Sequence, residues 1–255
     1  MQPARTVIAD AFPDSVFRHL ERDAVVCVDV LQATTTLVTA VAQGRRAFAA
    51  STPAEAAQLA AGLDRPLLAG EAAGPRAAPF ELPDSPAALA RDADRDRPLV
   101  LCSRPGTELI RNAEAAPAAL VACFRNASAT AAYLARHHRH VAVLIAGVRE
   151  ELSCEDQMAA GRILARLFAH GFAPADRRTA QMAGRWSDVD VALAAWGNSA
   201  SLLREDGRGE DVDFVLAHVE DVPFACAYRR GEVGRADEPR AAAGPVVAEA
   251  EAAAR

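Results

Sequence analysis

The chain has 255 residues and a formal net charge of -6, with 51% hydrophobic and 24% charged residues. The negative charge argues against a nucleic-acid-binding protein, which usually carries a basic surface, and no apolar segment is long enough to cross a bilayer. The N-terminus has no signal-peptide pattern and the five cysteines form no C-x-x-C pair, so we expect a soluble cytoplasmic protein whose partners include neither nucleic acid nor membrane.

Short apolar runs alternate with segments of helical period along most of the chain. Strands are predicted at residues 4–9, 25–29, 46–50, 66–70, 98–102, 118–123 and 140–146. Helices are predicted at residues 34–43, 52–62, 107–115, 126–137 and 153–168, with a short helix that begins at residue 85. Residues 173–204 have a helical pattern, and residues 211–228 are expected to form a last helix and an edge strand.

Strands separated by helices predict an α/β protein, with a three-layer α/β/α fold and a largely parallel or mixed sheet. We expect residues 1–230 to form one domain, either as a single unit or as two closely joined lobes. In residues 231–255, Ala, Glu, Gly, Pro and Arg dominate without periodicity. This composition predicts a disordered tail.

Two acidic residues follow predicted apolar strands directly. Asp29 ends the strand at 25–29 and Glu71 follows the strand at 66–70, while Ser103 and Gly147 also come just after strands. Because the carboxyl ends of parallel strands share one edge of a sheet, we expect these residues to converge. Carboxylate oxygens suit Mg²⁺. We therefore predict Asp29 and Glu71 as metal ligands and catalytic residues.

Glu155 and Asp156 begin the predicted helix at 153–168. They are candidate catalytic residues, because they would extend the acidic cluster. A structural interpretation is equally consistent with the pattern, since acids in the first turn of a helix are stabilised by the helix dipole alone.

Several predicted helices begin with hydroxyl or amide side chains, which bind phosphate together with free backbone N–H groups. The candidate substrate-binding residues of this kind are Thr34, Thr35, Thr36, Ser103, Asn126 and Ser128. Arg104, Arg125 and Arg149 are candidates for contacts with an oxyanion. The alternatives are structural, because Ser, Thr and Asn are common N-cap residues and each arginine is also explained as a surface charge.

Several motifs, taken in order, resemble one known family. They are VDVLQATTT at 28–36, AGE at 69–71, FEL at 80–82 with SP at 85–86, NAS at 126–128, AG at 146–147, SCED at 153–156, AG at 160–161 and DVDF at 211–214. This succession resembles the 2-phosphosulfolactate phosphatase (ComB-like) family. The resemblance implies a Mg²⁺-dependent α/β/α phosphatase that hydrolyses 2-phosphosulfolactate, a small phosphorylated organic acid, in coenzyme M biosynthesis. Asp29, Glu71, Glu155 and Asp156 match acidic positions of that family.

The chain also departs from the family pattern. Gln32 stands where the family usually has Arg, Ala72 replaces an Arg after Glu71, and the segment around Pro105 differs as well. Two further hypotheses therefore remain: a phosphatase with a different substrate, and a non-catalytic relative that binds an anionic metabolite or a partner protein. The sequence also leaves a homo-oligomer open.

Overall fold

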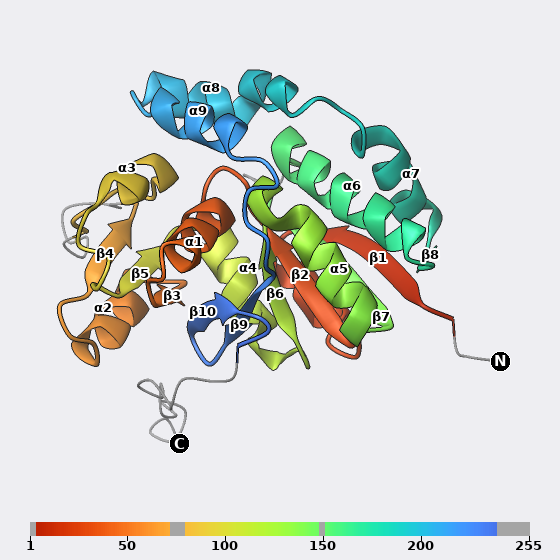
Figure 1. Cartoon of the computed structure of the whole chain (residues 1–255), viewed down its shortest axis with the longest axis horizontal. Coiled ribbons are helices and arrows are strands. Elements are labelled where there is room, and N and C mark those ends of the chain that lie inside the picture. The colour runs from red at the N-terminus through yellow and green to blue at the C-terminus, as the bar shows by residue number, and fades with distance from the viewer. Residues whose placement is uncertain (1–3, 72–79, 148–150, 239–255) are drawn as a thin grey trace.

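The computed structural model describes residues 4–71, 80–147 and 151–238, and within them it shows a three-layer α/β/α fold around a mixed sheet of ten strands (Figure 1). The strands are β1 (Thr6–Ala11), β2 (Ala24–Val28), β3 (Ala47–Ala49), β4 (Leu67–Gly70), β5 (Leu99–Cys102), β6 (Ala119–Ala122), β7 (His140–Ile145), β8 (Ala173–Pro174), β9 (Cys226–Arg229) and β10 (Glu232–Arg235). The α-helices are α1 (Ala33–Ala42), α2 (Pro53–Ala61), α3 (Pro86–Arg91), α4 (Gly106–Asn112), α5 (Ala127–His137), α6 (Cys154–Ala169), α7 (Arg177–Trp186), α8 (Asn198–Glu205) and α9 (Gly209–Ala217). Short 3-10 helices are η1 (Pro13–Arg18), η2 (Ala113–Ala115), η3 (Phe124–Asn126) and η4 (Val191–Trp196).

The sheet consists of two groups of parallel strands joined by an antiparallel hairpin. The strand order is β4-β5-β3-β10-β9-β6-β2-β7-β1-β8. The hairpin strands β9 and β10 pair antiparallel with each other, with β6 on one side and with β3 on the other. Three antiparallel steps therefore separate the groups, so the β4–β5–β3 group runs in the opposite sense to the β6–β2–β7–β1–β8 group. The α/β class and the largely parallel sheet confirm the prediction from the sequence.

The hairpin differs from the prediction in two ways. The expected edge strand is β9, which lies inside the sheet between β6 and β10. Residues 232–235, predicted as part of a disordered tail, form β10. The reason is a two-residue turn in which Arg230 and Gly231 have φ of 52° and 85°, as in a type I′ hairpin, and it returns the chain so that Val233 is buried. The rest of the predicted tail, 239–255, lies outside the described residues.

The buried strand β2 lies between β6 and β7 in the larger strand group. All five of its residues have 0% exposure, which explains its unbroken apolar sequence. Helix α6 packs against β7, β1 and β2, while α1 contacts β6, β3 and β10. The segment expected to be helical from 173 to 204 contains the two-residue strand β8 and then α7, η4 and α8.

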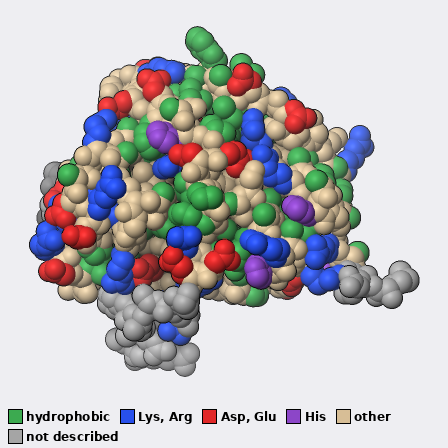
Figure 2. Space-filling view, in the orientation of Figure 1, with side chains coloured by type: hydrophobic (Ala, Val, Ile, Leu, Met, Phe, Trp, Pro, Cys, Tyr) green, Lys and Arg blue, Asp and Glu red, His purple; other side chains and the backbone are tan. Residues whose placement is uncertain are grey.

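The surface of the face shown in Figure 2 carries acidic and basic side chains interspersed with apolar ones. Within the described ranges, none of the helices has both the length and the apolar character needed to cross a membrane.

Candidate active site

A cleft of about 830 Å³ lies where the loops after β2, β4 and β5 meet the α8–α9 segment. Its polar lining residues are Asp29, Gln32, Glu71, Glu81, Asp84, Ser103, Arg104, Ser199, Asp206 and Arg208. Its apolar lining includes Leu31, Phe80, Leu82, Leu202 and Leu203. In Figure 1 the α8–α9 segment lies at the top of the view, above α1 and α3. Three of the four residues predicted to converge, Asp29, Glu71 and Ser103, thus line one cleft, whereas the fourth, Gly147, is not among its lining residues.

Asp29 is held at the end of β2 by the first turn of α1. The Thr34 hydroxyl donates to the backbone oxygen of Asp29 at 2.6 Å, and the backbone N–H of Asp29 donates to Thr34 Oγ1 at 3.1 Å. The Asp29 carboxylate accepts a hydrogen bond from the backbone N–H of Ala33. It also packs against Gly106, where a Cβ atom would lie only 2.1 Å from Asp29 Oδ2. The start of α4, which follows β5, therefore abuts the residue after β2 although the two strand groups run in opposite senses.

The carboxylates at the cleft raise one another's proton affinity. Burial raises the pKa of Asp29 to about 8, and the charges of Asp84, Glu155 and Glu71 add to that rise in pKa. Burial likewise raises the pKa of Asp84 to about 6, although hydrogen bonds from Ser103 and Thr36 oppose the shift. The Thr36 hydroxyl lies 2.6 Å from Asp84 Oδ1. Because like charges so close together repel, this cluster favours a bound cation.

Glu155 and Asp156 are buried at the start of α6, and neither is a lining residue of the cleft. Asp156 Oδ1 accepts a hydrogen bond of 2.7 Å from the backbone N–H of Val30, and the Asp156 carboxylate also accepts one from the Gly147 backbone. Burial, with the charges of Asp29 and Glu155, holds the pKa of Asp156 well above its usual range. Asp156 therefore stabilises the loop that carries Asp29 by a backbone hydrogen bond and does not itself line the cleft.

The three threonines at the start of α1 are buried, and their hydroxyls have partners inside the protein. Thr34 bonds to Asp29, Thr35 donates to the backbone oxygen of Val30 at 2.7 Å, and Thr36 donates to Asp84. None of the three is among the lining residues of the cleft. In this structure they shape the site rather than face a ligand.

The predicted residues at the start of α5 lie elsewhere. The Asn126 side chain accepts from the Cys123 backbone N–H and donates to the Val121 oxygen, at 3.0 and 3.1 Å. The Ser128 hydroxyl accepts from Arg166 Nε at 2.6 Å. These contacts are structural, and neither Asn126 nor Ser128 lines the cleft.

The predicted arginines divide into three cases. Arg104 lines the cleft with 65% of its side chain exposed, and its guanidinium lies 3.8 Å from Glu108. Arg125 forms a two-bond ion pair with Asp221, with both distances 2.9 Å. Arg149 lies outside the described residues.

Asp84 and Arg208 are lining residues that the sequence patterns did not single out. Asp84 lies in the segment before α3, where only Ser85 carries a capping signal. Arg208 is the N-cap residue of α9 and stands between Gly207 and Gly209. An arginine between two glycines was the available signal in the sequence, but only the packing of the α8–α9 segment shows where it lies.

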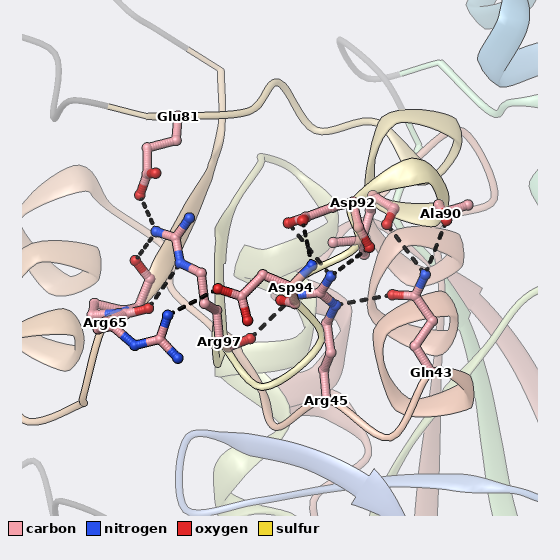
Figure 3. A network of polar contacts seen from close by, with 10 residues as sticks. Gln43, Arg45, Arg65, Glu81, Ala90, Asp92, Asp94 and Arg97 are labelled. Carbon is pink, nitrogen blue, oxygen red and sulfur yellow. Dashed lines mark hydrogen bonds and ion pairs between the residues drawn. The ribbon is translucent and has the colours of Figure 1, made fainter.

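A network of arginines anchors the wall of the cleft that carries Glu81 (Figure 3). Arg97 donates to Glu81 Oε1 at 2.6 Å and to the Pro66 oxygen at 2.8 Å, next to the start of β4. The side chain of Arg45 is fully buried and donates to the backbone oxygen of Asp94 at 2.6 Å. The segment from 92 to 97 and the Glu81 wall are thereby fixed to the sheet.

Within the described ranges, no three His, Cys, Asp or Glu side chains are spaced so that they could hold a metal ion by themselves. Magnesium, however, is commonly held by one or two carboxylates, with water and substrate phosphate completing its six ligands. Asp29 and Glu71 on one cleft, with Asp84 beside them, provide oxygen donors of that kind. The donor chemistry fits a hard divalent cation.

Comparisons with known proteins match most of the chain. The family model described as 2-phosphosulpholactate phosphatase matches residues 11–227. A protein of Synechococcus sp. (strain CC9605) named "Probable 2-phosphosulfolactate phosphatase" is 33% identical over 79% of this chain and 87% of its own length. Proteins of the same name from Deinococcus radiodurans and Carboxydothermus hydrogenoformans are 34% and 32% identical over 80% and 61% of this chain. The chain spans 86% of the Deinococcus protein but only 65% of the Carboxydothermus protein.

Proposed function

Because the chain belongs to the 2-phosphosulpholactate phosphatase family, we propose that it is a Mg²⁺-dependent phosphatase acting on a small phosphorylated organic acid. The first candidate substrate is 2-phosphosulfolactate, whose hydrolysis gives sulfolactate and phosphate. The observation that carries this proposal is that Asp29, Glu71 and Asp84 line one cleft together with Ser103 and Arg104. Carboxylate ligands next to hydrogen-bond donors suit a divalent cation and a phosphate group together.

Each residue has a proposed role in binding and orientation. Asp29 and Glu71 would hold the ion, which supplies a positive charge that polarises the phosphoryl group. Arg104 is exposed enough to turn toward a phosphoryl oxygen. The position of Ser103 is fixed by two contacts, since its backbone N–H donates to Thr107 at 3.2 Å and its side chain bonds to Asp84.

A substrate bound against the apolar part of the lining would displace water from the reacting group. Leu31, Leu82 and Leu202 lie along the cleft. Removing water strengthens the interaction of the phosphate with charged and polar groups, because the local dielectric constant falls.

The test is release of phosphate from 2-phosphosulfolactate and a panel of other phosphate monoesters, with Mg²⁺ and with EDTA. We expect Mg²⁺-dependent hydrolysis that Asp29→Asn reduces to near background, because the substitution removes the charge and keeps the shape. Asp64→Asn is the matched control, since Asp64 is exposed and lies outside the cleft lining. Hydrolysis that persists in EDTA, or that Asp29→Asn leaves unchanged, contradicts the proposal, as does a panel without any hydrolysed member.

A second candidate is a non-catalytic relative that binds an anionic metabolite. It is favoured by Gln32, a neutral residue in the cleft lining where the family resemblance leads us to expect a charged one. Calorimetric titration separates the two candidates. Binding of phosphorylated acids without turnover, unaffected by Asp29→Ala, would support the binding protein, whereas a phosphatase with another substrate is identified by the panel itself.

A further inference from the structure

Arg208 brings a guanidinium into the cleft from the turn between α8 and α9. Its backbone is fixed in the turn before α9, because its N–H donates to the Leu203 oxygen at 2.7 Å and its oxygen accepts from the Asp211 N–H at 3.1 Å. The side chain lines the cleft and is only 25% exposed. The chain contains no lysine, so arginine supplies every permanent side-chain cation in the protein.

Among the described residues, the guanidinium of Arg208 has one ion pair, with Asp206, and that pair is long. Its Nη2 lies 3.6 Å from Asp206, and its Nη1 donates to Gln32 Oε1 at 3.2 Å and reaches the Asp84 backbone oxygen only at 3.5 Å. The Arg125–Asp221 pair, by contrast, has two bonds of 2.9 Å. A partly buried cation that is held this loosely is costly unless a further anion neutralises it.

Gln32 orients Arg208. Gln32 is buried, with 5% of its surface exposed, and its amide oxygen accepts from the guanidinium. Its nitrogen Nε2 is buried and has no hydrogen-bond partner within the described part of the chain. This orientation leaves one donor unsatisfied, which indicates that the contact with Arg208 determines how the amide is placed. The neutral amide fixes Nη1 without cancelling the positive charge.

We propose that Arg208, positioned by Gln32, binds a second anionic group of the substrate, a carboxylate or a sulfonate, beside the phosphate. With Nη1 engaged by Gln32, the edge formed by Nε and Nη2 can bind two oxygens of such a group, which is the usual geometry of arginine with an oxyanion. The substrate class is then a phosphate ester with a further negative charge near the ester carbon. This inference rests on the proposed function, because it concerns the same cleft.

The experiment compares three substrates: phosphoglycolate, the phosphate ester of 2-hydroxyethanesulfonate, and ethyl phosphate, which has no charged group besides its phosphate. In Arg208→Gln we expect KM for the better of the two acidic esters to rise about 10- to 100-fold, as for the loss of one charge-assisted contact. The KM for ethyl phosphate should change by no more than about twofold, and kcat should change little for all three substrates. The two acidic esters distinguish a carboxylate subsite from a sulfonate subsite.

Two further variants test the role of Gln32 and guard against misfolding. Gln32→Glu keeps the shape but gives Arg208 a carboxylate partner, so it should raise the same KM while Arg208 remains in place. Arg208→Lys should restore part of the preference for acidic esters. Arg204→Gln is the matched control, because Arg204 is an exposed arginine on α8 that does not line the cleft.

Failure of this inference differs from failure of the proposed function. If Arg208→Gln raises the KM for ethyl phosphate as much as the KM for the acidic esters, or changes none of them, the Arg208 subsite is wrong. The proposal of a phosphatase is then unaffected. If no ester is hydrolysed, titration with sulfoacetate and malonate still decides the subsite. Binding that is lost in Arg208→Gln supports it without phosphatase activity, and binding that is absent or unaffected by the substitution overturns it.

Discussion

The carboxylate of Asp156 accepts a 2.7 Å hydrogen bond from the backbone N–H of Val30, the residue directly after Asp29. The start of α6 thereby fixes the loop that presents Asp29 to the cleft. Asp156 also accepts from the Gly147 backbone, so a single buried side chain joins the loops after β2 and β7. Asp156, which the sequence allowed either as a catalytic residue or as an acid stabilised by the helix dipole, thus supports the loop that carries its neighbour Asp29.

The first prediction concerns the two ways of removing the Asp156 charge. Asp156→Ala leaves the N–H groups of Val30 and Gly147 without their acceptor, which should lower the free energy of unfolding by about 1–3 kcal/mol. Asp156→Asn keeps an acceptor oxygen and removes a charge that burial already disfavours, so its stability should stay within about 1 kcal/mol of the unmodified protein. Urea unfolding at neutral pH measures both. Equal losses in the two variants would show that the charge, and not the hydrogen bond, matters.

The second prediction concerns the contact between α4 and Asp29. In Gly106→Ala the new methyl group would lie 2.1 Å from Asp29 Oδ2 and 2.6 Å from the Ala33 Cβ atom. Since the atoms that it meets belong to the buried side chains of Asp29 and Ala33, Asp29 must move, and we expect most of any phosphatase activity and of any Mg²⁺-induced rise in Tm to be lost. Differential scanning fluorimetry with and without Mg²⁺ follows the second effect without an assay of turnover.

Gly184→Ala is the matched control for that substitution. Gly184 lies within α7, and a Cβ atom there would meet nothing within 4 Å. The substitution should stabilise the protein by roughly 0.5–1 kcal/mol, because alanine is the better helix former. An unchanged Mg²⁺ response in Gly106→Ala would mean that Asp29 does not bind the ion.

The strand ends were the part of the site that the sequence revealed. Asp29, Glu71 and Ser103 each follow a short apolar strand, and this local pattern was sufficient to predict that they meet. Contrary to expectation, they do not meet through the carboxyl ends of one parallel sheet. An inserted hairpin makes one strand group run opposite to the other. Its turn, Arg230-Gly231, lacks the Asn-Gly or Asp-Gly signal of most type I′ hairpins, so the sequence pattern concealed it.

The sequence patterns could not predict the residues that only tertiary packing brings to the cleft. Asp84 and Arg208 come from loops without a periodic pattern, and they enter the cleft because α9 packs against α3 and α8. Thr34, Thr35 and Thr36 show the opposite case. Their position at a helix start suggested phosphate contacts, but the same geometry lets each hydroxyl bond to an oxygen inside the protein.

The third prediction concerns the cap of α3, next to Asp84. Ser85 Oγ accepts from the Ala88 N–H at 3.0 Å and donates to Asp211 Oδ1 at 2.5 Å. Ser85→Ala removes the cap and a donor to a buried carboxylate, so we expect a loss of about 2–4 kcal/mol of stability. Because Asp84 precedes it in the cleft, KM for phosphate esters should rise as well.

Thr52→Ala on α2 serves as the control for Ser85→Ala. Thr52 caps α2 by accepting from the Glu55 N–H at 3.1 Å, and it does not line the cleft. Its loss should cost about 1 kcal/mol and leave KM unchanged. If the two variants had the same stability and the same KM, the contact between Ser85 and Asp211 would have no role beyond capping.

The fourth prediction concerns the dependence of stability on pH. Burial alone would raise the pKa of Asp10, but hydrogen bonds from His19, the Ala11 backbone and Arg18 outweigh it and hold the pKa below the ordinary 3.8. His19 and Arg18 both reach Asp10 Oδ2 at 2.9 Å. A carboxyl whose pKa is lower in the folded state binds fewer protons there, so its stabilisation is complete above pH 3.8 and is lost as pH falls through the folded value.

Asp10→Asn should therefore be less stable than the unmodified protein at neutral pH, by about 1–2 kcal/mol for hydrogen bonds to a partly exposed charge. The difference should shrink as the pH drops below 3.8, where the native carboxyl becomes protonated too. Thermal unfolding between pH 2 and 7 measures both, with the exposed Asp14→Asn as control. A stability difference that stays constant down to the acidic limit would mean that the Asp10 side chain contributes by its shape and not by its charge.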